Sequence, residues 1–219
     1  MEPTVWHSRM MKDPNLGIKQ GLAAKWFGGD WDPPTHISPT SSEQLESLMR
    51  YARGEPLPRE AFPEALYVFD RKGFNKIGEL FTAGSYYAVR GKLAQVLSEC
   101  NLGRGGLISI TIYEEDKATP IAGESFIWNF AEQKLAFLPE QSPKIRPAGI
   151  GASIEKNKWK VHPDVQDGDI ALSSAAAGPP DVWCDPRLPL SLFFTHSLVS
   201  ALREAKIEFD FRVCRCRLV

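Results

Sequence analysis

Thiol and imidazole side chains are the groups of this chain that could carry nucleophilic or metal chemistry, and the sequence has four cysteines and four histidines. Cys184 could act as a nucleophile with His196 as its base, because a thiol needs a neighbouring base or positive field to ionise. The sequence identifies no third group that would orient the histidine. The same kinds of side chain could instead bind zinc through thiolate and imidazole ligands. The candidate ligands are Cys184, Cys214, Cys216 and either His162 or His196.

The spacing of these residues argues against a metal site. Cys214 and Cys216 are separated by one residue, whereas the knuckles of zinc sites space their cysteines further apart. Two residues that are two apart on a strand share one face, so these thiols are more simply two small buried side chains. We therefore predict no metal and no cofactor.

Familiar catalytic motifs are absent from the sequence. It contains no Gly-x-Ser-x-Gly elbow, no phosphate-binding Gly-x-x-x-x-Gly-Lys-Ser/Thr loop, no His-Glu-x-x-His and no Cys-x-x-Cys pair. The glycine-rich run at 103–106 follows a predicted helix, whereas a dinucleotide-binding loop runs from a strand into a helix. The chain is therefore predicted not to be an enzyme. The alternatives are an enzyme of unfamiliar type that uses Cys184 or His196, or a non-catalytic structural or regulatory module.

A local acidic segment is the most distinctive charge pattern. Residues 161–186 contain five aspartates and neither Lys nor Arg, so the formal charge of the segment is 0 − 5 = −5. One interpretation is a docking face for a basic partner, with Trp183 either as an aromatic anchor or, equally, as a core residue. The other is a set of solvated aspartates that initiate turns. The predicted partner-binding residues are Asp164, Asp167, Asp169, Asp181, Trp183 and Asp185.

Overall charge and hydropathy restrict the environment of the protein. The 219 residues include 26 basic and 27 acidic side chains, so no global field favours nucleic acid or an anionic membrane as the partner. Residues 1–7 lack the basic and then apolar run of a signal peptide, and no apolar run approaches the roughly 20 residues that span a bilayer. We therefore predict a cytoplasmic protein with reduced thiols.

The elements that would position these residues are clearest at the C-terminal end. Apolar residues at 198, 201, 202 and 205 predict a helix over 195–205 with one buried side, and Thr195 is its expected N-cap. A strand follows from residue 209, where the alternation changes phase between Val213 and Cys214 and predicts a β-bulge.

The same order of elements occurs earlier in the chain. A helix with apolar residues from Val89 to Cys100 precedes a strand from Leu107 to Tyr113. The repetition indicates either two related units or only a common choice of helix followed by strand. A β-hairpin is predicted from 125–130 and 134–138.

The N-terminal part differs in composition from the rest. Residues 1–65 contain many Pro and Gly residues and one convincing helix, over 43–53, so we predict an irregular arm packed on the body. Residues 66–219 are predicted to form the main domain, in which 139–160 is loop-like and 169–172 is a short strand. The fold class is α+β, with a largely antiparallel sheet and about three principal helices.

The C-terminal pattern resembles a family of bacterial immunity proteins that accompany polymorphic and type VI-delivered toxins. The resemblance is carried by Asp181-Val182-Trp183-x-Asp185 and by the helix and strand that follow, and it covers about residues 66–219. It implies a non-enzymatic cytosolic protein that binds and neutralises a cognate toxin, encoded by the adjacent gene, by occluding its active site. The oligomeric state stays open.

Overall fold

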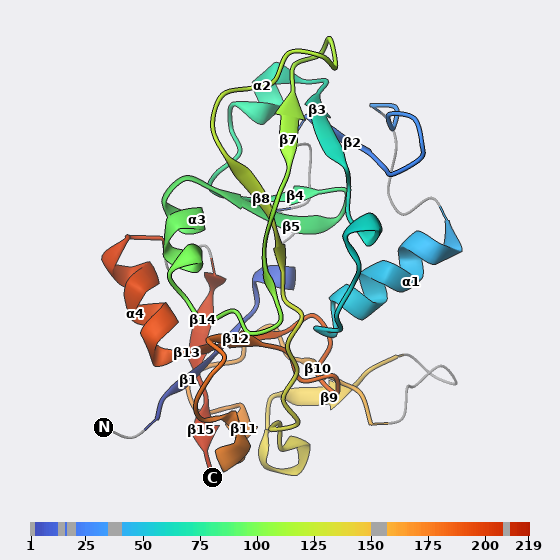
Figure 1. The fold of residues 1–219 in the computed structure, drawn as a ribbon. Helices are drawn as coiled ribbons and strands as arrows, with labels where there is room; N and C mark the ends of the chain where they lie inside the picture. Colours follow the sequence, from blue (N-terminus) through green and yellow to red (C-terminus); the bar gives the residue numbers. More distant parts are fainter. Residues whose placement is uncertain (1–2, 13–15, 17–20, 35–40, 150–156, 208–210) are drawn as a thin grey trace.

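Two four-stranded antiparallel sheets form the body of the protein in the computed structural model, which describes residues 3–12, 16, 21–34, 41–149, 157–207 and 211–219 (Figure 1). The first sheet has the order β4 (Leu80–Ala83), β5 (Tyr86–Arg90), β8 (Ser125–Asn129), β6 (Gly106–Ser109). The second has the order β12 (Val182–Trp183), β13 (Leu192–Thr195), β1 (Val5–Ser8), β14 (Val213–Arg215).

Smaller sheets and four helices complete the described part of the fold. The remaining strands are β2 (Leu22–Lys25), β3 (Ala65–Val68), β7 (Thr111–Tyr113), β9 (Ile145–Pro147), β10 (Trp159–Val161), β11 (Ala171–Leu172) and β15 (Arg217–Leu218). The helices are α1 (Ser42–Tyr51), α2 (Arg71–Phe74), α3 (Gly91–Ser98) and α4 (His196–Glu204). Strand pairs are antiparallel except β3 with β7 and β11 with β15. The predicted α+β class with a mostly antiparallel arrangement and three principal helices is confirmed.

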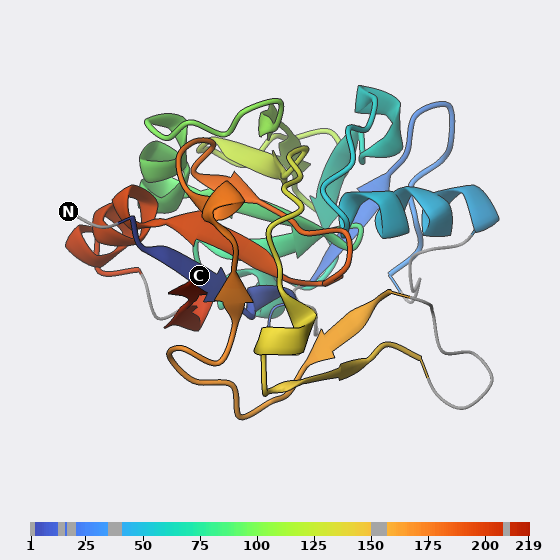
Figure 2. The same ribbon diagram turned by 90° about the horizontal axis from the view of Figure 1, so that it is seen from below.

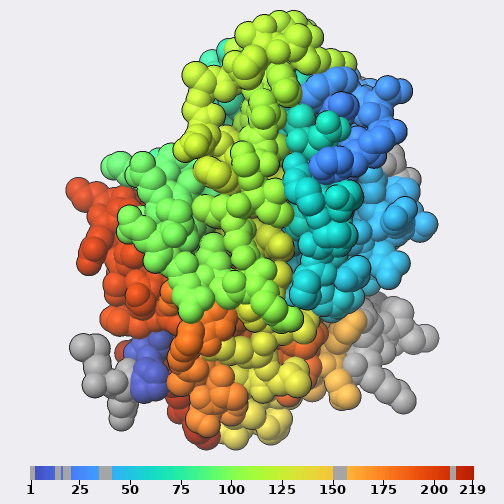
Figure 3. Space-filling model, viewed as in Figure 1, coloured from blue at the N-terminus to red at the C-terminus, as the bar shows by residue number. Residues whose placement is uncertain are grey.

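The two large sheets have the same internal order. In each, a strand leads through a helix to a second strand, as β5–α3–β6 and as β13–α4–β14, and a third strand lies between the two. The intervening strand is β8 in the first sheet and the N-terminal β1 in the second. Helices α3 and α4 contact each other at one edge of the molecule (Figures 1 and 3). The repeated order of helix and strand thus extends to the strand order of both sheets.

The second sheet is buried on both faces. On one face Phe194 stacks on Trp128 of the first sheet, with ring centroids 6.3 Å apart, in the main core. On the other face a row of side chains in register crosses all four strands: Trp183, Phe193, His7 and Cys214. Trp183, Phe193 and Cys214 belong to a second hydrophobic core, in which His7 is a buried polar residue. Because both faces pack against protein, the strands that form this sheet need no polar alternation.

The prediction that residues 1–65 are irregular is wrong at two places, where β1 and β2 are strands. Val5–Ser8 pairs with β13 on one side and β14 on the other, and Leu22–Lys25 pairs with β3. Each strand is only four residues long, and most of its partners lie far away in the sequence, so local patterning gave no signal. The predicted helix over 43–53 is confirmed as α1, whose N-cap Ser41 accepts from Gln44 N.

Several predicted boundaries also change. Helix α3 begins at Gly91 and not at Val89, because Tyr86–Arg90 forms β5. The predicted strand over 107–113 divides at Ile110 into β6 and β7, which join different sheets.

Two predicted β features are wrong. The β-bulge is absent, since Ser8, His7 and Trp6 pair with residues 213, 214 and 215 without a break. No hairpin joins β8 to 134–138, where the described residues make only isolated bridges, and the loop predicted for 139–160 contains β9 and the start of β10.

The C-terminal helix agrees closely with its sequence pattern. Its N-cap Thr195 accepts a hydrogen bond from Leu198 N at 3.4 Å, and Leu198, Val199 and Leu202 are buried. The strand predicted over 169–172 is confirmed for its last two residues, which form β11. None of the described helices has the length and apolar character needed to cross a membrane.

The Tyr51 side chain connects α1 to the first sheet by hydrogen bonds. Its hydroxyl donates to Trp128 O at 2.7 Å and accepts from Tyr87 N at 3.2 Å, in a fully buried position. We expect Tyr51→Phe to lower the free energy of unfolding by about 1–2 kcal/mol, because two hydrogen bonds are lost, one of them to the buried Trp128 carbonyl. Urea denaturation measures this loss. The matched control is Tyr113→Phe, which should change stability by less than about 0.5 kcal/mol.

Candidate functional site

Trp183 and Asp185, two of the residues predicted to contact a partner, lie inside the protein. Both are 0% exposed. The Trp183 ring stacks on Phe193 with centroids 4.3 Å apart and an angle of 12°. Of the two alternatives for Trp183, the surface anchor is wrong and the core residue is confirmed, since Trp183 belongs to the second core.

The Asp185 carboxylate organises the chain around it. One oxygen accepts from Ala136 N at 3.0 Å and from Phe137 N at 2.8 Å. Arg187 donates through its backbone N at 3.0 Å and through its guanidinium at 3.0 and 2.8 Å. These hydrogen bonds raise the pKa of Arg187. Asp185 is thus a structural carboxylate that holds the segment at 136–137 beside residues 183–185.

Asp181 and the aspartates of 164–169 are mostly engaged within the protein as well. Asp181 accepts from Asn101 N at 2.8 Å and from the Thr195 hydroxyl at 2.5 Å, so it joins the end of α3 to the start of α4. Asp167 accepts from Arg215 N at 2.7 Å, and Asp169 accepts from Gln166 N at 2.8 Å.

These contacts fit the interpretation of turn-forming residues. Asp164 is the most open of the group, with a side chain 75% exposed and 3.5 Å from His162. The structure therefore divides the acidic segment into fold-stabilising aspartates and a small exposed remainder.

No hydrogen bond joins Cys184 to His196 in the part of the chain that the structure describes. Cys184 is buried, and burial followed by the neighbouring Asp185 charge raises the pKa of its thiol to about 12. A thiol with so high a pKa is a poor nucleophile at neutral pH. His196 is exposed on α4, where its Nε2 lies 3.4 Å from the Ser200 hydroxyl.

The cysteines considered as zinc ligands are separated between two cores. Cys184 lies in the main core, whereas Cys214 and Cys216 lie in the second core. Burial raises the pKa of Cys214 to about 11. Within the described ranges, no group of three or more His, Cys, Asp or Glu residues is arranged to hold a metal ion.

His7 was missed by the sequence analysis. It is fully buried in the second core, its Nδ1 lies 3.7 Å from Cys214 Sγ, and its ring packs on Phe193 at 5.5 Å. Its Nε2 has no hydrogen-bond partner among the described residues. Burial, with the charges of Lys12 and Arg9, lowers the pKa of His7 to about 3, so this imidazole is neutral in the folded protein at neutral pH. His7 is buried because β1 lies between β13 and β14, and no local pattern in the sequence predicts that strand.

Helix α1 carries two exposed apolar side chains four residues apart, Leu45 and Met49. Leu45 is 49% exposed and Met49 is 47% exposed, although with Leu48 and Ala52 they form the apolar residues at helical spacing from which this helix is predicted. The neighbouring flank of the helix borders a hollow of about 540 Å³. Aromatic residues Trp26 and Phe27 line this hollow together with polar side chains of α1. A helix that leaves part of its apolar stripe in water offers a surface for another protein.

No protein-family model matches the chain, and no curated protein and no solved structure is significantly similar to it.

Proposed function

We propose that this protein is an immunity protein that binds a cognate toxin and neutralises it by occluding the toxin's active site. The observation that carries the proposal is the exposed apolar pair Leu45 and Met49 on α1, a helix held firmly by Tyr51. Exposed apolar side chains with polar surroundings are typical of protein-binding surfaces. The resemblance of the segment 181–185 and of the following helix to immunity proteins supports the same function.

The burial of Trp183 and Asp185 moves the proposed contact surface away from the acidic segment. A partner cannot reach either side chain without unfolding the second core. The α1 surface, in contrast, needs no rearrangement for contact. Binding through preformed surfaces is the usual behaviour of tight protein inhibitors.

Co-expression with the product of the adjacent gene tests the proposal. We expect the toxic product to kill cells that lack this protein, and we expect cells that contain both to survive and to yield a stable complex. Survival without a complex would indicate enzymatic reversal of the toxin's damage, and absence of protection would contradict the proposal.

The double variant Leu45→Glu with Met49→Glu tests the surface. We expect it to weaken the complex at least tenfold, because truncation of a buried interface anchor typically costs more than about 1 kcal/mol. Isothermal titration calorimetry measures the affinity. The matched control is Leu135→Glu with Leu190→Glu, which alters two other exposed leucines in the same way. Equal affinities of the two double variants would exclude α1 from the interface.

A further inference from the structure

Four basic side chains from two distant parts of the chain form what we call the basic cluster, in which the charges of Arg9, Arg146 and Lys160 all act on Lys12. Arg146 on β9 and Lys160 on β10 are direct cross-strand partners. Arg9 and Lys12 belong to one tight turn, in which Lys12 N donates to Arg9 O at 2.9 Å. Figure 2 shows the hairpin of β9 and β10, in yellow to orange, at the periphery of the fold.

The hairpin presents its two cations to solvent because of its alternation. Ile145 and Trp159 pack against the second core, and Val161 belongs to it. Arg146 and Lys160, which alternate with these apolar residues along the two strands, are exposed. Like charges placed directly opposite each other destabilise a strand pair, so this arrangement costs free energy in the isolated protein.

No ion pair in the described part of the chain compensates the cluster. The salt bridges of the described residues involve other cations, such as Arg187 with Asp185 and Arg71 with Glu114. Although the Lys12 side chain reaches solvent, the surrounding protein lowers its pKa to about 8, and the charges of Arg9, Lys160 and Arg146 act in the same direction. Cations that repel one another in this way gain free energy when an anion binds between them.

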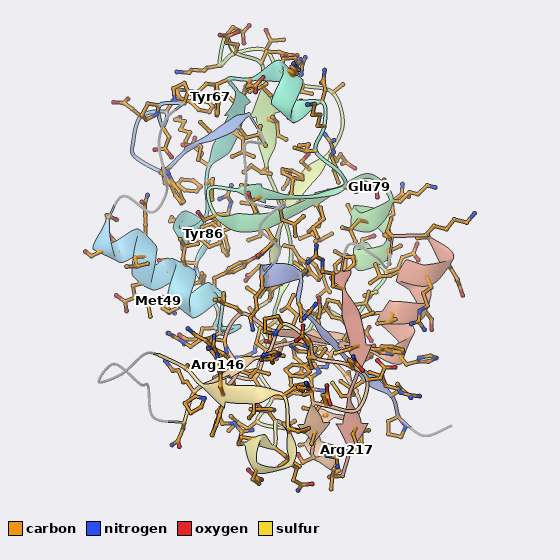
Figure 4. The ribbon with its side chains drawn as sticks, turned by 180° about the vertical axis from the view of Figure 1, so that it is seen from behind. Met49, Tyr67, Glu79, Tyr86, Arg146 and Arg217 are labelled. Atoms are coloured by element: carbon orange, nitrogen blue, oxygen red, sulfur yellow. The ribbon has the colours of Figure 1, made fainter. Side chains whose placement is uncertain are left out.

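We propose that the basic cluster binds carboxylates presented by a protein partner. The inference rests on the proposed function and names the chemistry of the partner's surface. Figure 4 shows Met49 on α1 and Arg146 on β9 on the same side of the molecule, so one partner can cover an apolar and a basic area together. The apolar neighbour favours an acidic protein surface over nucleic acid, whose phosphate backbone gains nothing from contact with Leu45 and Met49.

Two double variants of equal charge change provide the test. Arg146→Glu with Lys160→Glu reverses the hairpin half of the cluster. The matched control, Lys76→Glu with Lys92→Glu, reverses two exposed lysines elsewhere. Fluorescence anisotropy of a labelled octaglutamate peptide and of a labelled 16-base-pair DNA duplex is measured with each protein at low and high salt. Arg146→Gln with Lys160→Gln serves as a neutral version should the reversed variant fold poorly.

We expect the wild-type protein to bind octaglutamate, the cluster variant to bind it at least tenfold more weakly, and the control to behave as wild type. Binding should weaken as salt rises, because exposed charges are screened. Equal binding by the cluster and control variants would overturn the site, and tighter cluster-dependent binding of DNA would overturn the choice of a protein ligand.

Affinity for the co-expressed partner separates this inference from the proposed function. If no complex forms with the wild-type protein, the proposed function fails, while the octaglutamate result still decides whether the cluster binds carboxylates. If the complex forms and the cluster variant binds as tightly as wild type, the proposed function stands and the partner's use of the cluster is refuted.

Discussion

Replacing Asp185 with alanine is expected to lower the free energy of unfolding by about 2–6 kcal/mol, the combined cost of leaving two buried backbone amides without an acceptor. The carboxylate is fully buried, so solvent cannot replace it. Its loss leaves the backbone amides of Ala136 and Phe137 without an acceptor, and each unmet buried amide costs about 1–3 kcal/mol. Arg187 keeps partial contact with solvent, so the amides account for most of the effect.

Urea denaturation followed by circular dichroism measures this effect. The control Asp164→Ala removes an exposed carboxylate of the same segment and should change stability by less than about 0.5 kcal/mol. Asp185→Asn retains an oxygen acceptor for the two amides and should lose less than Asp185→Ala. A loss below about 1 kcal/mol for Asp185→Ala would refute the structural role of this carboxylate.

Acidification is expected to destabilise the protein through His7. The pKa of this imidazole is about 3 in the folded state and about 6.5 when the chain is unfolded, so between these values only the unfolded state takes up the proton. The contribution is therefore fully favourable above about pH 6.5 and is lost progressively as the pH falls towards 3. Each pH unit below 6.5 is worth about 1.4 kcal/mol, which gives a loss of about 2–3 kcal/mol at pH 4.5.

His7→Leu isolates this contribution. The variant removes a titrating group whose Nε2 has no hydrogen-bond partner among the described residues. Because leucine is apolar and similar in size to histidine, the variant protein should still fold. The loss of stability from pH 7.5 to pH 4.5, measured by urea denaturation at each pH, should be about 2–3 kcal/mol smaller than in wild type. His196→Gln, which removes an exposed histidine, should retain the wild-type pH dependence. An unchanged pH dependence in His7→Leu would disprove the burial of a neutral imidazole.

The clearest sequence signature has a structural explanation. Both aspartates of Asp181-Val182-Trp183-Cys184-Asp185 accept hydrogen bonds from distant segments, and Trp183 fills the second core. The signature therefore fixes how β12 joins the rest of the protein. We propose that the exposed residues of α1 and the basic cluster contact the partner.

The sequence by itself determined the elements whose information is local. Helix α4 follows from apolar residues at helical spacing behind the N-cap Thr195, and α1 follows from the same spacing behind Ser41. Both depend on contacts between residues three or four apart, so no distant partner is needed to predict them. The α+β class follows from these helices together with short strands of alternating or continuous apolar residues.

Only the tertiary structure decided which residues are buried and which reach a partner. β1 lies between β13 and β14, whose residues are about 190 to 210 positions away, and that placement buries His7. Trp183 and Asp185 looked accessible in an acidic segment and are enclosed, whereas Leu45 and Met49 had a core-like pattern and are exposed. Burial is set by packing between segments that are distant in sequence, and the local pattern of polar and apolar residues does not record which segments meet.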